Sequence, residues 1–438
     1  MKERAKSVLL CLLVLCSLVL TYQLWFGQRP LETTAESDYE PVYFDETRPL
    51  SQMIHPQRIY IYRGEKHYQV RRGEPGFDFF WEELSELLQE MAELDYYYDK
   101  EGLLDGAALF ISMQFEPHLP LGPESIWLKS RRGGQLAGLE IWRWEERYWA
   151  RLEEAGGAAP LLLLPPGWAG RLVGLYDRFE PQPEQLCELL PAGEIMMVRQ
   201  TAVKPSESVC VPAAISRMKR YSLKKERLDE EALLKTFFIN RNLVREIKEK
   251  DGGLIYTDGE QGLRLERGLE YSHPQPGQKR GDLSYPAALL KVGKLLGYHG
   301  GWPDSLYLEN LERQERSGGS TEGLYRAQWR SYLDGFPLLG DNGVEMTYHH
   351  GLQSYRRNLY EHSQGSGAGV KVKGYRNALR AAVKLLQGKG EQQLILEGLD
   401  LAYYLEGTEA VPVWVVRLSG EVIPLKTDKL VPPEGWKP

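Results

Sequence analysis

The stretch LEIWRWEERYWARL, residues 139–152, contains two strand-like runs, 139–144 and 147–152, that are separated by only two residues. Aromatic and branched side chains pack well on a half-buried pleated surface, so both runs predict β-strands. Strands joined by so short a turn pair as antiparallel neighbours, because a parallel pair needs a crossover of a dozen or more residues. The stretch therefore predicts an antiparallel sheet with helices packed on one side.

The remainder of the chain contains further strand and helix patterns. Strands are predicted at residues 108–115, 125–129, 324–333 and 344–350, with hairpin turns at Asp258-Gly259 and at residues 419–421. Apolar residues at three- and four-residue spacing predict helices at residues 78–95, 285–297 and 375–387. Residues 222–252 predict two more helical segments, broken at residues 240–242. The fold class is therefore predicted to be α+β.

The chain is long enough for several domains, since about 400 residues exceed what one hydrophobic core usually serves. Residues 251–271 and 333–355 share an order of strand, Asp-Gly turn and strand, which predicts a duplicated module in the last two domains. The predicted parts are a cytoplasmic tip and transmembrane helix at 1–28, an acidic stalk at 29–45, a first α+β domain at 46–190, a central α+β domain at 191–283 and a C-terminal α+β domain at 284–438.

An unbroken apolar run, SVLLCLLVLCSLVLTYQLWF, occupies residues 7–26. Its helix would be ~30 Å long, the thickness of the hydrocarbon core of a bilayer. Bulky residues from Tyr22 to Phe26 argue against signal-peptide cleavage, and the Leu before Cys11 and before Cys16 argues against lipidation. Basic residues before the run and acidic residues after it predict a single-pass protein of the cell membrane, with a cytoplasmic amino terminus and most of the chain outside.

Charge and cysteine content exclude two classes of protein. A net charge of -7 and a pI near 5.8 argue against a nucleic-acid partner, which calls for a basic footprint. Only Cys187 and Cys210 lie outside the apolar run, which is too few for a scaffold built from disulfides. The sequence leaves open whether these two residues pair with each other or remain thiols.

No motif assembles an enzyme site, so neither catalysis nor a cofactor is predicted. The Gly-rich segment GSGAG at 365–369 lacks the spacing and the Lys of a phosphate loop, and it is interpreted as a flexible loop. The S-x-x-K matches at residues 216–219 and 222–225 have no accompanying S-D-N or K-T-G. His349 and His350 are adjacent on a predicted strand, where they point to opposite faces and cannot bind one metal ion.

The segment from Arg217 to Lys250 is rich in Lys and Arg but also contains six acidic residues. This mixture predicts a solvated helix face. The alternative is a contact with an anionic wall polymer or a lipid head group.

Several stretches resemble the YycH family, whose members are accessory proteins of the essential WalK/WalR (YycG/YycF) two-component system of low-GC Gram-positive bacteria. The resemblance is carried by MKERAKSVLLCLLVLCSLVLTYQLW at the start and continues through FFINRNLVREIKEKDGGLIYTDGEQGL, YHGGWPD and WRSYLDGFPLLGD. In the last stretch, Trp329 and Phe336 replace the aromatic residues of the family pattern, and Leu338 and Leu339 replace its Val and Phe. Residues 100–190 match the family least.

The resemblance implies a regulator rather than an enzyme. A three-domain α+β exterior would pair with a YycI-like sister protein, and the membrane spans of both would pack against those of a WalK-type sensor histidine kinase and so affect cell-wall metabolism. One face of the predicted span would form that contact, with residues at three- and four-residue spacing: Leu10, Val14, Ser17, Thr21 and Leu24. Alternatively, Ser17 and Thr21 bond their own backbone carbonyls and face lipid.

The interface with the sister protein is predicted on the last two domains, where aromatic and arginine residues of the kind enriched at binding surfaces occur: Tyr325, Trp329, Arg330 and Tyr332. Trp329 can equally belong to the core. Two other functions remain open, an extracytoplasmic module that binds a wall fragment or peptide and a membrane-tethered hydrolase.

Overall fold

The fold is that of a computed structural model, which divides into two compact units, Met1–Val42 and Tyr43–Pro438. The structure describes residues 13, 14, 17, 44, 53–74, 76–91, 97–98, 107–121, 134–155, 160–199, 201–238, 240–250, 252–266, 268–274, 283–303, 305–316, 320–340, 343–349, 351–358, 360–363, 367–386 and 393–436.

Little of the predicted membrane span falls within these residues. Leu13, Val14 and Ser17 are helical and exposed, whereas Leu10, Thr21 and Leu24 lie outside the described residues. In the described part of the chain, no helix has the length and apolar character required to cross a membrane. The span and its contact face therefore remain predictions.

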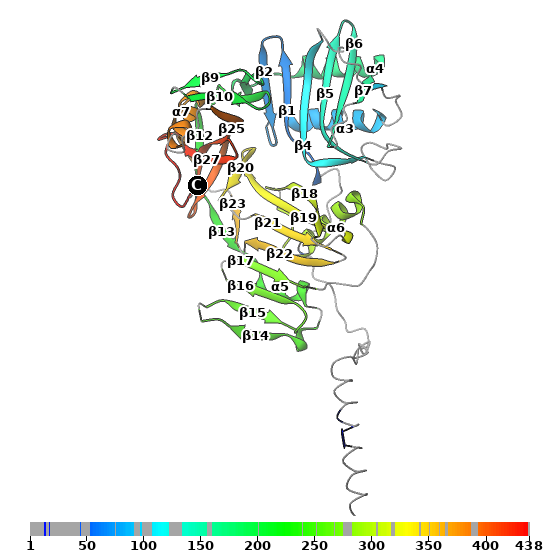
Figure 1. The fold of residues 1–438 in the computed structure, drawn as a ribbon, viewed down its shortest axis with the longest axis vertical. Helices are drawn as coiled ribbons and strands as arrows, with labels where there is room; N and C mark the ends of the chain where they lie inside the picture. Colours follow the sequence, from blue (N-terminus) through cyan, green and yellow to red (C-terminus); the bar gives the residue numbers. More distant parts are fainter. Residues whose placement is uncertain are drawn as a thin grey trace, which may run out of the picture. The chain divides into compact units, whose positions relative to one another are not determined.

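The larger unit begins with a nine-stranded sheet in which all strand pairs are antiparallel (Figure 1). Residues 139–152 lie in its β5–β6 hairpin, in which Trp144 pairs with Arg147, as predicted. The spatial order is β11-β8-β2-β1-β4-β5-β6-β7-β3. The strands are β1 (Pro56–Arg63), β2 (Lys66–Arg71), β3 (Tyr97–Tyr98), β4 (Ala108–Leu121), β5 (Gly134–Trp144), β6 (Arg147–Glu154), β7 (Pro160–Leu163), β8 (Leu186–Leu190) and β11 (Val209–Pro212).

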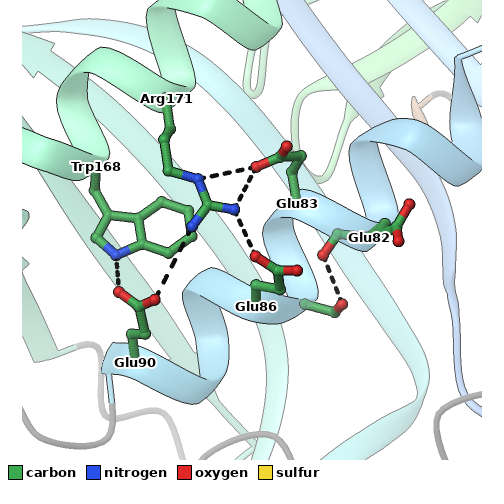
Figure 2. A network of polar contacts seen from close by, with 7 residues as sticks. Glu82, Glu83, Glu86, Glu90, Trp168 and Arg171 are labelled. Carbon is green, nitrogen blue, oxygen red and sulfur yellow. Dashed lines mark hydrogen bonds and ion pairs between the residues drawn. The ribbon is translucent and has the colours of Figure 1, made fainter.

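Two helices, α3 (Phe77–Met91) and α4 (Pro166–Arg178), pack on this sheet. The predicted apolar stripe of α3 is buried, and α4 begins at Pro166, because a proline suits the first helical turn. On the exposed side, Arg171 of α4 contacts Glu83 and Glu86 of α3 at 2.6 and 2.5 Å, and the Trp168 indole donates to Glu90 (Figure 2). Exposed ion pairs of this kind contribute little, so the buried stripe accounts for most of the helix packing.

The second sheet has 16 strands, and its antiparallel first part, here called the central sheet, has the order β14-β15-β16-β17-β22-β21-β19-β18. Helices α5 (Glu230–Phe237) and α6 (Tyr285–Tyr298) contribute to the core on one of its faces (Figure 1). The strands are β14 (Arg245–Lys248), β15 (Leu254–Thr257), β16 (Gly262–Leu265), β17 (Gly268–Ser272), β18 (Leu306–Arg316), β19 (Ser320–Leu333), β21 (Val344–Tyr348) and β22 (Leu352–Asn358).

The rest of this 16-stranded sheet, here called the carboxy-terminal sheet, is joined to the central sheet through β20, and helix α7 (Tyr375–Leu386) packs on it. Its centre is the long β25–β26–β27 meander, and both β10 and β20 pair with β25 in parallel. The strands are β9 (Met196–Val198), β10 (Thr201–Pro205), β12 (Arg217–Ser222), β20 (Phe336–Leu339), β24 (Gly367–Lys371), β25 (Gln393–Glu406), β26 (Glu409–Leu418) and β27 (Glu421–Lys426), while β13 (Lys224–Arg227) and β23 (Tyr360–Ser363) pair separately. The predicted α+β class with mainly antiparallel sheets is confirmed.

Two sequence interpretations are wrong. The second helical segment predicted within residues 222–252 is strand β14, and the basic run from Arg217 to Lys250 forms β12, β13, α5 and β14 rather than one helix face. Gly367, Ala368 and Gly369 of the segment GSGAG belong to strand β24, which pairs with β12, whereas a loop was predicted. Both errors have one cause: charge-rich and Gly-rich segments have weak local preferences, so a neighbouring strand decides their structure.

Long-range pairing also crosses the predicted domain ranges. β11 pairs with β8 across residue 190, and β17 pairs with β22 across residue 283. The two segments proposed as duplicates pair differently: β15, β16 and β17 form a meander, whereas β20 and β21 pair with different stretches of β19, Tyr332–Leu333 and Tyr325–Trp329.

Cys187 and Cys210 form a disulfide between β8 and β11, which settles the pairing that the sequence left open. Their Cα atoms are 5.8 Å apart, within the usual range for a disulfide. The intervening chain leaves the first sheet, forms the β9–β10 hairpin of the carboxy-terminal sheet and returns. The disulfide therefore closes the loop that carries this hairpin.

Candidate functional site

The described residues contain no arrangement typical of a metal or nucleophile site. No group of three or more His, Cys, Asp or Glu side chains among them could hold a metal ion. Both S-x-x-K matches lie on or beside strands β12 and β13, where residues three apart project to opposite faces. His349 follows β21, and His350 is outside the described residues.

The most strongly perturbed histidine has a structural role. His299 follows α6, stacks on Phe237 with ring centroids 4.1 Å apart, and its Nδ1 lies 3.0 Å from the Thr236 hydroxyl. Burial lowers the pKa of His299 to about 3, because a charged imidazole would lose its hydration. His299 is therefore neutral near pH 7 and serves as a packed core residue.

Two of the four predicted interface residues belong to the core. Tyr325 and Trp329 are buried on the inner face of β19. The Tyr325 hydroxyl donates to the Leu283 carbonyl at 2.8 Å, and Trp329 meets Trp302 edge-to-face with centroids 6.1 Å apart. In this structure neither side chain is available to a partner.

Arg330 and Tyr332 lie on the opposite, outward face of β19. Arg330 donates to Glu309 at 2.6 Å and remains partly exposed. Arg326, four residues earlier on the same face, contacts Glu345 at 2.9 Å and Glu312 at 3.9 Å. The outward face of the central sheet is thus the place where arginine side chains gather.

Charges of alternating sign run across neighbouring strands on this side. In the strand register, Arg264 of β16 is opposite Glu270 of β17, Glu270 is opposite Arg356 of β22, and Arg356 is opposite Glu345 of β21. Together with Arg326 these residues define what we call the ion-pair face. Opposite charges placed directly across strands support the strand register.

The ion-pair face is open to solvent and contains a shallow groove. The groove has a volume of about 410 Å³ and is lined by residues that include Ile255, Arg264, Glu270 and Arg356. Arg356 contacts Glu270 at 3.3 Å, and about half of each side chain is exposed. Exposed pairs contribute roughly 0.2–1 kcal/mol each, so this charge pattern does little for stability and remains available for recognition.

Near the carboxyl end of β19, the outward side chain of Tyr332 belongs to a buried polar cluster. Tyr332 packs edge-to-face against Tyr307 with centroids 5.3 Å apart. The Arg72 guanidinium lies 4.7 Å from the Tyr307 ring centroid and donates to the His55 and Pro56 carbonyls at 2.7 and 3.1 Å. Arg72, which follows β2, thereby contacts aromatic side chains of β18 and β19 in the central sheet.

Two more arginines from the first sheet reach the carboxy-terminal sheet. Arg58 of β1 contacts Asp400 of β25 at 2.8 Å, with 22% and 13% of the two side chains exposed. Arg71 contacts Glu74 at 2.8 Å and lies 4.7 Å from the ring centroid of Phe336. We call Arg58, Arg71, Arg72, Glu74 and Asp400 the junction.

Burial and ion pairing act on the junction arginines in opposite directions. Burial is the largest effect on Arg58 and lowers its pKa, but Asp400 and Tyr60 together outweigh it, so the pKa of Arg58 is raised. For Arg71, burial dominates over Glu74 and lowers the pKa. Arginine remains charged in both cases, so the carboxylates are needed to balance buried positive charge.

The β19–β20 turn fits closely against the junction. Asp334 and Gly335 both have positive φ, 49° and 76°, as in a tight two-residue hairpin turn. Asp334 accepts a hydrogen bond from the Tyr221 hydroxyl. A Cβ atom on Gly335 would lie 2.3 Å from the Arg72 carbonyl oxygen, so only glycine fits.

Comparison with known proteins finds a family match at the amino terminus and a solved structure of similar fold. Residues 3–123 match the family described as YycH protein, N-terminal domain. The crystal structure of YycH from Bacillus subtilis matches with a TM-score of 0.54 at 16% identity, covering 87% of this chain and 98% of that one. Residues 3–123 thus belong to the YycH family, and the chain shares the fold of the Bacillus subtilis protein. The resemblance drawn from the sequence is thereby confirmed, and it extends from the amino-terminal family match to the fold of most of the chain.

A second solved structure, an uncharacterized protein from Eubacterium rectale ATCC 33656, has a TM-score of 0.37 at 12% identity, covering 56% of this chain and 94% of that one. No curated protein matches the chain.

Sequence analysis missed the junction altogether. Arg58 and Asp400 lie on strands of different sheets and are far apart in the chain, so no local pattern connects them. One signal was present: Asp400 interrupts the apolar run from Leu399 to Tyr404, and a buried charge needs a partner.

Proposed function

We propose that this chain is a membrane-anchored accessory regulator of a WalK-type sensor histidine kinase and affects cell-wall metabolism through it. Membership of the YycH family carries the proposal, since it implies a role in the YycG/WalK regulatory system. Two buried groups with shifted pKa values, His299 and Arg58, serve core packing and ion pairing.

We further propose that the ion-pair face receives a YycI-like sister protein. The face presents partly exposed arginines, which are enriched at protein interfaces, beside a groove of about 410 Å³. Complementary charge patterns determine specificity and association rate more than affinity. This revises the interface predicted from the sequence: Arg330 and Tyr332 lie on the side of β19 that includes this face, and Tyr325 and Trp329 support it from the core.

Binding of the sister protein is tested by co-purification of the two full-length proteins from membranes. Arg356→Glu places a negative charge opposite Glu270 and Glu345 and should weaken recovery of the sister protein. Arg147→Glu, at an exposed position in the first sheet, makes the same charge change and should leave recovery unchanged. Equal recovery with both variants would exclude the ion-pair face as the docking surface.

Transmission to the kinase is proposed to occur through the span at residues 7–26. Ser17→Leu with Thr21→Leu should retain insertion but fill the small-residue face, which alters helix packing by ~1 kcal/mol or more and shifts a balanced equilibrium several-fold. Val19→Leu is the control on another face. A reporter of the kinase's target genes, with membrane abundance checked by blot, should change with the double variant and not with the control. Identical reporter output from the double variant and the control would show that the span serves only as an anchor.

A further inference from the structure

Helix α7 carries a row of exposed positive charge in a chain that is acidic overall. Residues 362–390 contain six Lys and Arg residues and no Asp or Glu, whereas the net charge of the chain is -7. Arg376, Arg380 and Lys384 recur at four-residue spacing, so they lie along one line of the helix, and all three are exposed. Lys373, also exposed, precedes the helix. We call these four residues the basic row.

Among the described residues, an ion pair neutralises only Arg376 of the basic row. Arg376 contacts Glu188 at 2.8 Å, but Arg380 and Lys384 have no ion-pair partner among the described residues. Like charges at four-residue spacing destabilise a helix. Close by in the chain, Arg217 and Lys371 are directly opposite each other on β12 and β24, which is likewise unfavourable. Unbalanced positive charge is therefore retained here at a cost to stability.

A groove adjoins the basic row. It has a volume of about 350 Å³ and lies between α7, β8 and β9, and the charged residues in its lining are Arg376, Arg380, Glu188 and Glu194. Leu190, Met196 and Leu379 contribute its apolar surface. Met197, also in the lining, is 69% exposed, which is unusual for a long apolar side chain on a strand.

Strand β9 offers main-chain hydrogen-bonding groups beside this groove. It is three residues long and, in the described part of the chain, pairs with β10 alone. An unpaired strand edge accepts an extended peptide as an additional strand, and adjacent pockets receive its alternate side chains.

We propose that the groove beside α7 binds an extended acidic segment of a partner protein. The segment adds to the edge of β9, places apolar side chains against Met196 and Met197, and places carboxylates on Arg380 and Lys384. This site lies outside the ion-pair face, so the inference does not depend on how the sister protein is bound.

An anionic membrane surface fits the same charges less well. A helix that binds a membrane surface inserts its apolar side chains into the lipid. Of the large aliphatic residues of α7, Leu379, Val383 and Leu386 are buried in the core of the carboxy-terminal sheet, and Leu385 is exposed. Helix α7 thus lacks the row of exposed apolar side chains that an interfacial helix inserts into lipid. The groove and the unpaired edge of β9 suit a peptide instead.

The test measures binding of a fluorescein-labelled peptide of alternating Glu and Val to the purified full-length chain by fluorescence anisotropy. We expect binding that weakens with added salt and that falls roughly tenfold or more in Arg380→Glu with Lys384→Glu. Met197→Ser should weaken binding about threefold without changing its salt dependence, because it removes apolar contact only.

Matched controls separate this site from general attraction between charges. Arg245→Glu with Lys250→Glu makes the same charge change at exposed positions at and beside β14 and should leave binding unchanged. Near-UV circular dichroism checks that each variant is folded. Absence of peptide binding, equal loss in both double variants, or equal binding of a Lys and Val peptide would overturn the proposal. If the chain binds vesicles of anionic lipid through Arg380 and Lys384 but does not bind the peptide, the ligand of the basic row is a membrane surface and the proposal is wrong.

Discussion

Replacing Asp400 by Asn tests the junction with almost no change in shape. The variant keeps the size of the side chain, so no cavity forms, but it removes the charge that Arg58 contacts at 2.8 Å. Removing one partner of a fully buried ion pair costs about 3–5 kcal/mol. Because 22% of Arg58 and 13% of Asp400 remain exposed, water compensates in part, and we expect a loss of about 2–3 kcal/mol in the free energy of unfolding.

The assay is urea unfolding of the full-length chain followed by tryptophan fluorescence, with the midpoint and slope fitted for each variant. Glu409→Gln is the control, because its pair with Arg220 lies in the same sheet with 46% and 45% of the side chains exposed. The control should lose at most about 1 kcal/mol. An Asp400→Asn variant as stable as the unmodified chain, or a control that loses as much, would refute the role assigned to the junction.

Three further changes test other parts of the fold. Gly335→Ala should cost about 2 kcal/mol or more in thermal or urea unfolding, because φ is 76° and the new Cβ meets the Arg72 carbonyl; full stability would contradict this. Cys187→Ser with Cys210→Ser should cost about 3 kcal/mol by releasing a 23-residue loop, and protease cleavage between β8 and β11 should rise; unchanged cleavage would contradict it. His299 has a pKa of about 3 when folded against 6.5 as the ordinary value, so the unfolded chain binds the proton first and stability falls as the pH drops below 6.5. The free energy of unfolding should fall between pH 7 and pH 5 by about 2 kcal/mol more in the unmodified chain than in His299→Asn. An equal fall in both would contradict the role of His299.

Local sequence patterns predicted the elements that bury a continuous apolar stripe. The helix predicted at 375–387 is α7, and the one predicted at 285–297 is α6, because buried residues recur at helical spacing in both. The alternation at 324–333 falls within β19, with Tyr325 and Trp329 on the inner face. These segments carry enough local information to specify both their structure and their buried side.

Elements that depend on distant partners could not be predicted. The residues of β14 are all exposed and rich in charge, so their local preference is helical, yet pairing with β15 makes them a strand. β9 and β10 join a sheet whose central strand begins nearly 200 residues later, and the ion-pair face depends on the register of several strands. Neither register nor sheet order is encoded in short-range periodicity.

Regulation of a WalK-type kinase is tested most directly by placing the full-length chain, a YycI-like protein and the kinase in one lipid bilayer and measuring the rate of kinase autophosphorylation. Addition of the chain should change this rate, and exchange of residues 7–26 for an unrelated apolar helix of equal length should abolish the change while the chain remains in the membrane. A rate that is the same with and without the chain would contradict the proposed function.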